Sequence, residues 1–536
     1  MTTFAALVAA RADDDSPGLK FEDQAQSWRA VIGAARARAA LAAELLPDTG
    51  PRHVGLLLEN SPENLYWLLG CAVSGATMVG INPTRRGQSL ARDVNFTDCR
   101  VIVTDSAHRH LLDGLDLDCP AENILVVDAP GTAERIAAAA AGPHADAGGT
   151  GTAPAATVTE STVFSLVFTS GTTSAPKAVI CTQGRLGRIA GQQVARRGLT
   201  RDDVFYVVMP MFHSNAIMAG IAPAVTTGGT LALRAKFSAS NWLADVRRYG
   251  ATFFNYVGKP LNYILATAEK PDDGDNPLRI AFGNEANEAD IAEFARRFDC
   301  QVIDSYGTSE GGMRINRVPG MPTGSLGVAD EGTIVIDPET RQECPRAVFD
   351  ADGRLVNGDE AIGEIVNVRT ADQFEGYYKN PAADAERVAH GIFWSGDLAY
   401  RDSDGYWFFA GRTSDRLRVD GENFAAAPVE RLLARFPAFN TVAVYAVPDP
   451  TVGDQVMVAA ELRADAEFDP VAFAEFLSAQ PDLGTKWAPR YVRLTAALPR
   501  TPTNKIVKRT LQTQGLETAD RLYHRPGPAL VYEQLV

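Results

Sequence analysis

Residues 165–182, SLVFTSGTTSAPKAVICT, place a loop of small and hydroxyl side chains between two short apolar runs. The runs at 166–168 and 178–180 are typical of buried strands. In the loop, Gly171 permits close backbone approach to a ligand, hydroxyl groups can donate to phosphate oxygens, and Lys177 supplies a positive charge. Ser, Thr and Gly are also common turn residues, and the Walker pattern GxxxxGK[ST] is absent. Taken alone, the stretch leaves both a phosphate-binding loop and an ordinary polar hairpin open.

On both sides of this loop, helical patterns alternate with short strand-like runs. The runs at 53–58, 101–104, 251–257 and 300–307 are examples. This rhythm predicts βαβ units and therefore parallel sheets covered by helices. A different pattern, with short β runs separated by Gly, Asp and Asn, occupies 324–369 and favours a small barrel or antiparallel sheet. The sequence thus predicts an α/β fold with an added small β-barrel.

Two segments carry special expectations. Residues 65–81 are uncharged, but glycines interrupt them and their length is at the lower limit for a membrane span, so we expect a buried helix that leads into a strand. Residues 137–159 are rich in Ala, Gly and Thr with almost no large apolar side chain, and they predict a flexible surface loop.

The composition limits the classes of protein to which the chain can belong. Its 536 residues, 46% hydrophobic and 22% charged, predict several folded units. With 51 basic and 66 acidic residues the formal net charge is −15, which disfavours nucleic-acid binding because phosphate contacts need a basic surface. The six cysteines show no CxxC pair or metal-type spacing, and the N-terminus shows no signal pattern. We therefore expect a cytoplasmic protein without a membrane span.

Four further segments follow the loop in a recognisable order. They are DSYGTSEGG at 304–312, WSGDLA at 394–399, GRTSDRLRVDGEN at 411–423 and PRTPTNKIVKR at 499–509. Together with the loop they resemble the motifs of the adenylate-forming superfamily, which includes acyl-CoA synthetases, luciferases and peptide-synthetase adenylation domains. The resemblance extends over about 25–515, and the chain is most similar to the fatty-acid-transport-protein and bile-acid ligase branch.

The resemblance implies a division into domains. An N-terminal domain over 1–413, built from two parallel-type α/β subdomains and a small β-barrel, would bind AMP and the acid. A hinge at 414–416, with Asp415 as its pivot, would join it to a mobile α+β domain over 417–536. The small domain would swing between two half-reactions that share one site.

The reaction implied by the resemblance begins with attack of a carboxylate on ATP. An acyl-adenylate and pyrophosphate form, and the acyl group then passes to CoA to give a thioester and AMP. The charge that develops on the phosphates calls for a metal and hydrogen-bond donors rather than a covalent nucleophile. We therefore expect ATP, Mg²⁺ and CoA as cofactors and a small carboxylic acid as the partner molecule, with a homodimer left open.

The resemblance assigns the nucleotide to three groups of residues. The phosphate loop would hold the β- and γ-phosphates through Thr169, Ser170, Gly171, Thr172, Thr173 and Lys177. An adenine slot would be formed by Gly283, Asn284, Glu285, Asp304, Ser305, Tyr306 and Gly307. Tyr306 would stack on the base. Asp397 would accept hydrogen bonds from both ribose hydroxyls, and Arg412 would contact the ribose or the phosphates.

Four residues are expected to act on the reacting groups. Lys505 would bridge the substrate carboxylate and the α-phosphate, where it offsets charge that builds up in the transition state. Thr308 would donate to the α-phosphate, and Glu310 would bind Mg²⁺. His213 would border the carboxylate. The alternatives are a plain surface lysine for Lys505 and a packed neutral histidine for His213.

The acid pocket and the CoA route follow from the same resemblance. The pocket wall would include His213, Asn255, Tyr256, Val257 and Gly258. The branch indicates a bulky apolar acid, such as a fatty, steroid or terpenoid acid. Gly421 and Glu422 would line the path of the CoA arm.

The sequence departs from the family pattern at three glycines. Ser174, Ala178 and Asn504 stand where relatives have glycine, which changes the conformational freedom of these loops. The efficiency of the second half-reaction is therefore left open. A second hypothesis is an adenylating enzyme that passes the acyl group to a carrier protein or another enzyme instead of CoA.

A third hypothesis is hydrolysis. The segment GTSEG at 307–311 also satisfies G-x-S-x-G after a strand, with Ser309, Asp397 and His524 in the order of an α/β-hydrolase triad. This interpretation leaves Lys505 and the Ser/Thr loop without a role. A non-catalytic binding protein is the fourth hypothesis.

Overall fold

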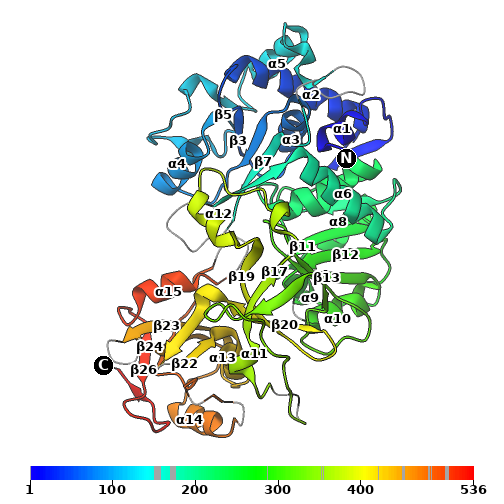
Figure 1. Ribbon diagram of the computed structural model, residues 1–536. Coiled ribbons are helices and arrows are strands. Elements are labelled where there is room, and N and C mark those ends of the chain that lie inside the picture. Colours follow the sequence, from blue (N-terminus) through cyan, green and yellow to red (C-terminus); the bar gives the residue numbers. More distant parts are fainter. Residues whose placement is uncertain are drawn as a thin grey trace. The chain divides into compact units, whose positions relative to one another are not determined.

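The computed structural model divides into two compact units (Figure 1). The first comprises Met1–Ser305 and Glu375–Asp384, and the second comprises Tyr306–Phe374 and Ala385–Val536. The residues that the structure describes are 2–149, 158–169, 177–286, 288–351, 353, 355–419, 422–449, 453–480, 483–484, 486–500 and 506–535.

A six-stranded, mostly parallel sheet forms the first half of the first unit (Figure 1). Its strands, in spatial order, are β6 (Ile124–Val126), β5 (Cys99–Thr104), β3 (His53–Leu57), β4 (Thr77–Gly80), β7 (Val163–Phe168) and β8 (Ala178–Thr182). The helices α2 (Trp28–Leu45) and α3 (Pro62–Ser74) pack on each other beside it. Ser27 and Ser61 start these helices, because each hydroxyl accepts a hydrogen bond from a backbone amide of the first turn. The phosphate-loop segment therefore lies between two paired strands, and β8 runs antiparallel to β7.

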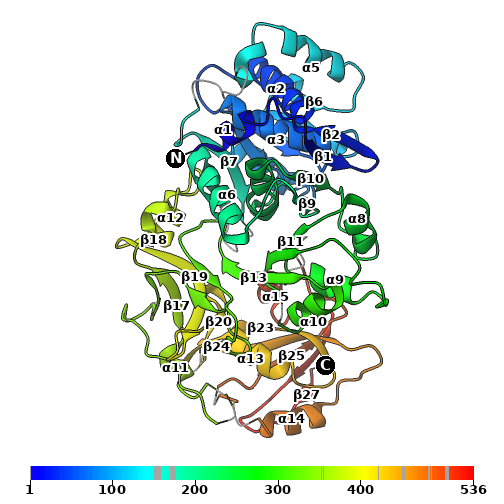
Figure 2. The same ribbon diagram turned by 90° about the vertical axis from the view of Figure 1, so that its right-hand side faces the viewer.

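A second sheet forms the rest of the first unit (Figure 2). Its strands within this unit, in spatial order, are β13 (Gln301–Gly307), β12 (Ile280–Asn284), β11 (Phe253–Val257), β9 (Val204–Val207), β10 (Thr230–Leu233), β1 (Pro17–Phe21) and β2 (Gln24–Ser27). The helices are α1 (Phe4–Ala9), α6 (Gln183–Arg197), α7 (Ala222–Thr227), α8 (Trp242–Tyr249), α9 (Pro260–Leu265), α10 (Glu288–Phe298) and a π-helical segment, Ala216–Ile221. Strands β9 to β13 are parallel neighbours, so their carboxyl ends share one edge. Trp242 anchors α8 to α10 through edge-on contacts with Phe294 and Phe298, 5.2 and 4.8 Å between ring centroids.

The segment Glu375–Asp384 extends the first sheet beyond β8. The Ile180 amide donates to the Gly376 carbonyl (3.0 Å), and the Tyr378 amide donates to the Ala178 carbonyl (2.9 Å). The Glu375 carboxylate accepts from the Thr182 amide (2.8 Å). This strand-like addition covers the edge that β8 would otherwise expose.

The second unit begins with short antiparallel strands. They are β14 (Arg314–Asn316), β15 (Val328–Ala329), β16 (Thr333–Ile336), β17 (Gly363–Asn367), β18 (Val388–Ala389), β19 (Ile392–Arg401) and β20 (Trp407–Arg412). Strands β16 to β20 form one antiparallel sheet, with β17 and β20 on either side of β19. The helices in this part are α11 (Gly358–Ala361) and α12 (Pro381–Arg387). The prediction of a small antiparallel β structure in this region is confirmed.

The rest of the second unit is an α+β sheet of seven strands. They are β21 (Arg416–Val419), β22 (Glu422–Ala425), β23 (Phe439–Asp449), β24 (Gly453–Leu462), β25 (Tyr491–Leu494), β26 (Arg521–His524) and β27 (Glu533–Gln534). The helices are α13 (Ala426–Leu433), α14 (Pro470–Ser478) and α15 (Lys508–Gln514). A cluster of aromatic rings fills its core, in which Phe439 stacks on Phe468 (5.9 Å) and Phe473 meets Phe436 edge-on (5.1 Å).

The predictions for residues 65–81 and 137–159 have different outcomes. Residues 65–81 do form a buried helix, α3, followed by the strand β4, as predicted. The flexible loop predicted for 137–159 is wrong over its first part, because α5 (Thr132–Ala141) and a 3-10 turn (Ala145–Gly148) occupy it. Alanine has the highest helix propensity, and Ile136 and Ala139 bury the inner face of α5. Residues 150–157 lie outside the described part of the chain. In the part that is described, no helix is long and apolar enough to cross a membrane.

Candidate functional site

The phosphate loop is described only at its two ends. Ser170, Gly171, Thr172, Thr173 and Ser174 lie outside the described residues. At the base of the loop, the Thr169 amide donates to the Lys177 carbonyl (3.1 Å), so the two ends are held together. The Lys177 ammonium lies 5.6 Å from the centre of the Tyr377 ring, within reach of a cation–π contact. Ala178, at a family glycine position, is fully buried in the core between the strands.

The adenine-slot residues of the first unit lie at the carboxyl ends of β11 to β13. Asp304 is buried and accepts hydrogen bonds from the Tyr256 hydroxyl (2.9 Å) and the Ala286 amide (3.1 Å). The Asn284 side-chain amide donates to the Ser305 carbonyl, which ties β12 to β13. Glu285 follows with a φ of 69°, a left-handed conformation uncommon for a residue with a side chain. The three strand ends are therefore held in one arrangement by polar contacts.

Gly283 permits this close packing. A Cβ atom on Gly283 would lie 2.5 Å from the Tyr256 carbonyl oxygen and 2.5 Å from its ring. No side chain fits there without movement of Tyr256, so this glycine has a steric role at the slot.

The predicted acid-pocket residues divide into buried and partly exposed groups. Asn255 and Tyr256 are fully buried. Asn255 donates to the Asn215 side-chain oxygen (2.7 Å), and Asn215 donates to the Tyr256 carbonyl (3.3 Å) just before the π-helical segment. Gly258 is buried, whereas Val257 and His213 keep exposed surface. Asn255, Tyr256 and Gly258 are therefore part of the packed interior, whereas His213 and Val257 have surface left for a ligand.

The loop that carries His213 is anchored by a residue that the sequence did not single out. Asn60, buried after β3, donates to the Met209 carbonyl and accepts from the Met211 amide, both at 2.9 Å. The His213 amide in turn donates to the Pro210 carbonyl (3.0 Å), and its ring lies 4.4 Å from the ring of Phe212. An asparagine three residues after a buried strand was the available signal, but asparagine is common in turns.

In the second unit, Asp397 is the centre of a charged cluster. The Tyr306 hydroxyl donates to its Oδ2 atom at 2.7 Å, and Arg412 Nε lies 3.6 Å from Oδ1. Burial raises the pKa of Asp397, whereas Arg412 and the Tyr306 hydroxyl act to lower it. Burial and the Asp397 charge raise the pKa of Tyr306, which keeps its hydroxyl protonated as a donor. The structure thus brings together the predicted base-stacking, ribose-binding and phosphate-side residues of this unit.

A bulge in β19 presents Asp397. Between the paired positions Glu364–Leu398 and Val366–Trp394, the register advances by two residues on β17 and by four on β19. The extra residues form the turn Ser395–Gly396–Asp397, in which Gly396 has a φ of 74°. Bulges of this kind redirect a side chain and are common beside functional sites. The segment WSGDLA at 394–399 therefore presents Asp397 from a bulge in β19.

Glu364, which no motif reasoning identified, holds this bulge. Its Oε1 atom accepts from the Gly396 amide at 2.7 Å, and its Oε2 atom lies 3.4 Å from the Thr413 hydroxyl. Burial raises the pKa of Glu364, and the hydrogen bond from Gly396 opposes that rise. An acidic residue beside two large apolar residues in a short strand was the signal that could have found it.

Thr308 and Glu310 lie in a tight turn after β13. The Thr308 hydroxyl donates to the Gly311 carbonyl (2.9 Å), and the Gly311 amide donates back to the Thr308 carbonyl (3.1 Å). The Glu310 side chain is only 8% exposed, and its Oε1 atom lies 3.9 Å from a guanidinium nitrogen of Arg387. The turn therefore fixes both residues that were expected to serve the α-phosphate and the metal.

The hydrolase interpretation is wrong. A nucleophile elbow requires a helix after G-x-S-x-G, but the strand β14 follows this segment. Asp397 is engaged by Tyr306 and Arg412, and the buried Nδ1 atom of His524 has no hydrogen-bond partner among the described residues. A serine triad is therefore not assembled.

The hinge segment and the C-terminal loop are described in part. Asp415 ends a 3-10 turn (Thr413–Asp415), and its carboxylate forms an ion pair with Lys508 at 3.2 Å. Lys508 also contacts Glu430 at 2.8 Å. Lys505, Asn504 and Gly421 lie outside the described residues, as does the side chain of Glu422 in β22.

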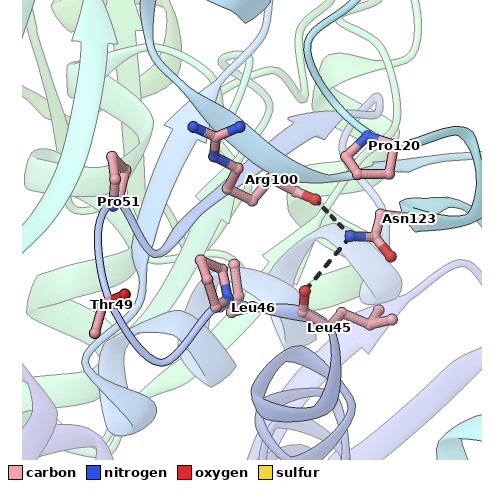
Figure 3. A pocket seen from close by; sticks show the side chains of 8 residues that line it. Leu45, Leu46, Thr49, Pro51, Arg100, Pro120 and Asn123 are labelled. Carbon is pink, nitrogen blue, oxygen red and sulfur yellow. Dashed lines mark hydrogen bonds between the residues drawn. The ribbon is translucent and has the colours of Figure 1, made fainter.

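A surface hollow of about 360 Å³ in the first unit is not part of this constellation (Figure 3). It is lined by Leu45, Leu46, Pro47, Thr49, Pro51, Arg100, Pro120 and Asn123. The Asn123 side chain closes one wall by donating to the Leu45 and Arg100 carbonyls, at 3.4 and 3.0 Å (Figure 3). None of the predicted site residues lines it.

Comparison with known proteins supports the interpretation of these motifs. The family model described as AMP-binding enzyme matches residues 8–378. A steroid-22-oyl-CoA synthetase of Rhodococcus jostii (strain RHA1) is 49% identical over 98% of this chain and 93% of its own length. The medium/long-chain-fatty-acid–CoA ligase FadD17 of Mycobacterium tuberculosis is 46% identical over 97% of this chain and 98% of its own. The solved structure of the O-succinylbenzoate coenzyme A synthetase MenE of Bacillus subtilis in complex with AMP matches the fold with a TM-score of 0.73, at 20% identity over 97% of this chain and 99% of that chain.

Proposed function

The chain belongs to the AMP-binding enzyme family, and on that premise we propose that it joins an apolar carboxylic acid to CoA with the use of ATP. The carboxylate of the acid attacks the α-phosphorus, pyrophosphate leaves, and the thiol of CoA then displaces AMP from the acyl-adenylate. The observation that carries the proposal is the cluster of Asp397 with Tyr306 and Arg412. It combines an acceptor for ribose hydroxyls, an aromatic ring for the base and a cation for phosphates within one unit.

The other residues divide the work around the nucleotide. Lys177 and the hydroxyls of the loop before it are proposed to hold the β- and γ-phosphates. Thr308 is proposed to donate to the α-phosphate; to do so, its hydroxyl must give up the hydrogen bond that it donates to the Gly311 carbonyl. Lys505 is proposed to neutralise the charge that develops between the substrate carboxylate and the α-phosphate.

Glu310 is suited to bind a magnesium ion that is also bound by the phosphates of the nucleotide. Among the described residues, no three His, Cys, Asp or Glu side chains are grouped to hold a metal. Mg²⁺ needs no such group, because it is commonly bound by one or two carboxylates together with substrate phosphates. The buried carboxylate of Glu310 supplies one such ligand. When bound, the ion would neutralise charge on the phosphate oxygens.

The acid is proposed to be large and apolar. The two relatives described above are named for a steroid acid and for medium- and long-chain fatty acids. His213 and Val257 are proposed to border the reacting end and the wall of its pocket, supported by the buried Asn255 and Tyr256. Asp415 is proposed as the pivot of the C-terminal domain, and Gly421 and Glu422 as the lining of the CoA route.

A panel of acids tests the activity. Purified protein is given ATP, Mg²⁺ and fatty, steroid-side-chain, terpenoid or amino acids, and acid-dependent pyrophosphate exchange is measured without and with CoA. Thioesters are detected by mass spectrometry. We expect exchange and thioester with bulky apolar acids. Exchange without thioester on every acid would instead support transfer to a carrier protein or another enzyme, and exchange with amino acids alone would contradict the substrate proposal.

The location and oligomeric state of the protein are also proposals. A cytoplasmic location agrees with six cysteines that are free thiols in the structure. A homodimer is proposed as the state to test by light scattering of the purified protein.

A further inference from the structure

Arg387, at the end of α12, lies near two acidic residues of the proposed nucleotide site, Glu310 and Asp397. One guanidinium nitrogen, Nη1, donates to the Trp394 carbonyl of β19 at 2.9 Å. The other, Nη2, lies 3.9 Å from the Glu310 carboxylate. The side chains of Arg387 and Glu310 are 21% and 8% exposed, so solvent screens this pair only weakly. The arginine therefore connects the turn that carries Glu310 with the strand that carries Asp397.

The guanidinium also packs against the bulge itself. A Cβ atom on Gly396 would lie 2.9 Å from Arg387 Nη1 and 3.5 Å from Nη2. Gly396 thus leaves the space that the guanidinium occupies, and its φ of 74° is another reason for glycine here. On the other side, Glu364 accepts from the Gly396 amide. The bulge is held between the buried carboxylate of Glu364 and the partly buried guanidinium of Arg387.

The charges around Asp397 agree with this geometry. Arg387 acts to lower the pKa of Asp397, of Glu364 and of Tyr306, so its positive charge reaches all three groups. Without Arg387, the carboxylates of Asp397, Glu364 and Glu310 would lie near one another without its positive charge. Arg412, whose side chain is 44% exposed, would still pair with Asp397.

On these grounds, and resting on the proposed function, we propose that Arg387 is a positioning residue of the nucleotide site. Its guanidinium fixes the bulge that presents Asp397 to the ribose and at the same time orients Glu310 for the metal-bound phosphates. Arginine suits this task because its planar fork holds two partners in fixed directions, which the single ammonium group of lysine cannot do.

The test uses Arg387→Met and Arg387→Lys in the full-length protein. Methionine keeps much of the length and loses the charge, and lysine keeps the charge and loses the fork. Arg401→Met is the matched control. The Arg401 side chain is 17% exposed, lies on β19, the strand of Asp397, and forms an ion pair with Glu343 at 2.7 Å. Thermal melting confirms that each variant is folded.

Two measurements distinguish a loss of nucleotide positioning from a general loss of structure. The KM for ATP and the kcat are measured in acid-dependent adenylation, and the affinity for AMP is measured by calorimetry without Mg²⁺, which needs neither metal nor turnover. For Arg387→Met we expect the KM for ATP and the Kd for AMP to rise about tenfold while kcat changes less than about threefold, as expected for the loss of interactions to charged groups. Arg387→Lys should lie between the wild type and Arg387→Met, and Arg401→Met should match the wild type.

Three outcomes would overturn the inference. The first is an Arg387→Met variant with the KM and AMP affinity of the wild type. The second is a fall in kcat alone, which would indicate an action on the transition state only. If Arg387→Met does not fold, the third is an Arg387→Lys variant with unchanged KM and AMP affinity. A wild-type protein without acid-dependent exchange would contradict the proposed function itself, which is a different result.

Discussion

The Tyr306 hydroxyl donates a 2.7 Å hydrogen bond to Asp397, although the two residues come from different strands, β13 and β19. This bond fixes the tilt of the tyrosine ring and the rotamer of the aspartate together. It uses Oδ2 of the carboxylate, while Oδ1 faces Arg412 at 3.6 Å. Tyr306, which is expected to stack on the base, and Asp397, which is expected to bind the ribose, are thus held in position by each other.

Replacing Tyr306 by Phe tests the role of this hydrogen bond. The ring that is expected to stack stays, but the donor to Asp397 is lost. One hydrogen bond to a charged group is worth about 1.5 kcal/mol, so the KM for ATP should rise about tenfold with little change in kcat. Tyr400→Phe is the control, because Tyr400 lies on β19, the strand of Asp397, and stacks on Phe408. An unchanged KM would show that the hydrogen bond does not organise the site.

The pH profile of the wild type offers a second prediction. Burial raises the pKa of Asp397 above its ordinary value, with Arg412, Tyr306 and Arg387 acting against that rise and Glu310 acting with it. As pH falls through this raised pKa, Asp397 becomes neutral and loses its attraction for Arg412 and its strength as an acceptor. The acid limb of kcat/KM for ATP should therefore lie above the ordinary aspartate value of about 3.9. In Tyr306→Phe the limb should move to still higher pH, because a group that lowers the pKa is gone. A limb that stays in place would contradict this assignment.

A third prediction concerns Gly283. A methyl group there meets the Tyr256 carbonyl and ring at 2.5 Å, and Tyr256 is tied to Asp304. Gly283→Ala should lower the free energy of unfolding by about 2 kcal/mol and raise the KM for ATP, because overpacking displaces the strand ends. Gly191→Ala in α6, where nothing lies within 4 Å of the added atom, should be neutral or stabilising in the same urea titration. Equal free energies of unfolding for the two variants would show that Tyr256 moves to accommodate the methyl group without loss of stability.

Much of the fold and part of the site could be predicted because the signals are local. Apolar runs predicted β11 to β13. The motifs singled out Asp304 and Asp397, which lie in β13 and β19. Arg387 and Glu364 were not predicted, because their importance arises only where β17 and β19 pair with a bulge. The small residues at 137–159 predict a loop, but the alanine run in α5 is helical, because alanine favours helix wherever one face can be buried.

Lys508 forms the basis of the last prediction, on stability. Its ammonium group, 15% exposed, contacts Asp415 at 3.2 Å and Glu430 at 2.8 Å, and Glu430 also accepts from the Val444 amide. Lys508→Met would leave two carboxylates facing each other, so the free energy of unfolding should fall by about 3 kcal/mol. Arg509→Met, which changes the exposed next residue, should have little effect.

The difference in the free energy of unfolding between the wild type and Lys508→Met should depend on pH in a way that follows from the sign of the pKa shift at Lys508. Burial lowers the pKa of Lys508, but the charges of Glu430 and Asp415 outweigh it, so the pKa in the folded protein is raised. A raised pKa means that the stabilisation is complete below the unfolded value of about 10.4 and is lost only as pH rises through the folded value. Urea unfolding of wild type and Lys508→Met should therefore differ by the same amount at pH 6 and pH 9, and the gap should narrow only at more alkaline pH. A gap that already narrows between pH 6 and pH 9 would mean that Lys508 titrates below its ordinary value and that the two carboxylates do not hold its charge.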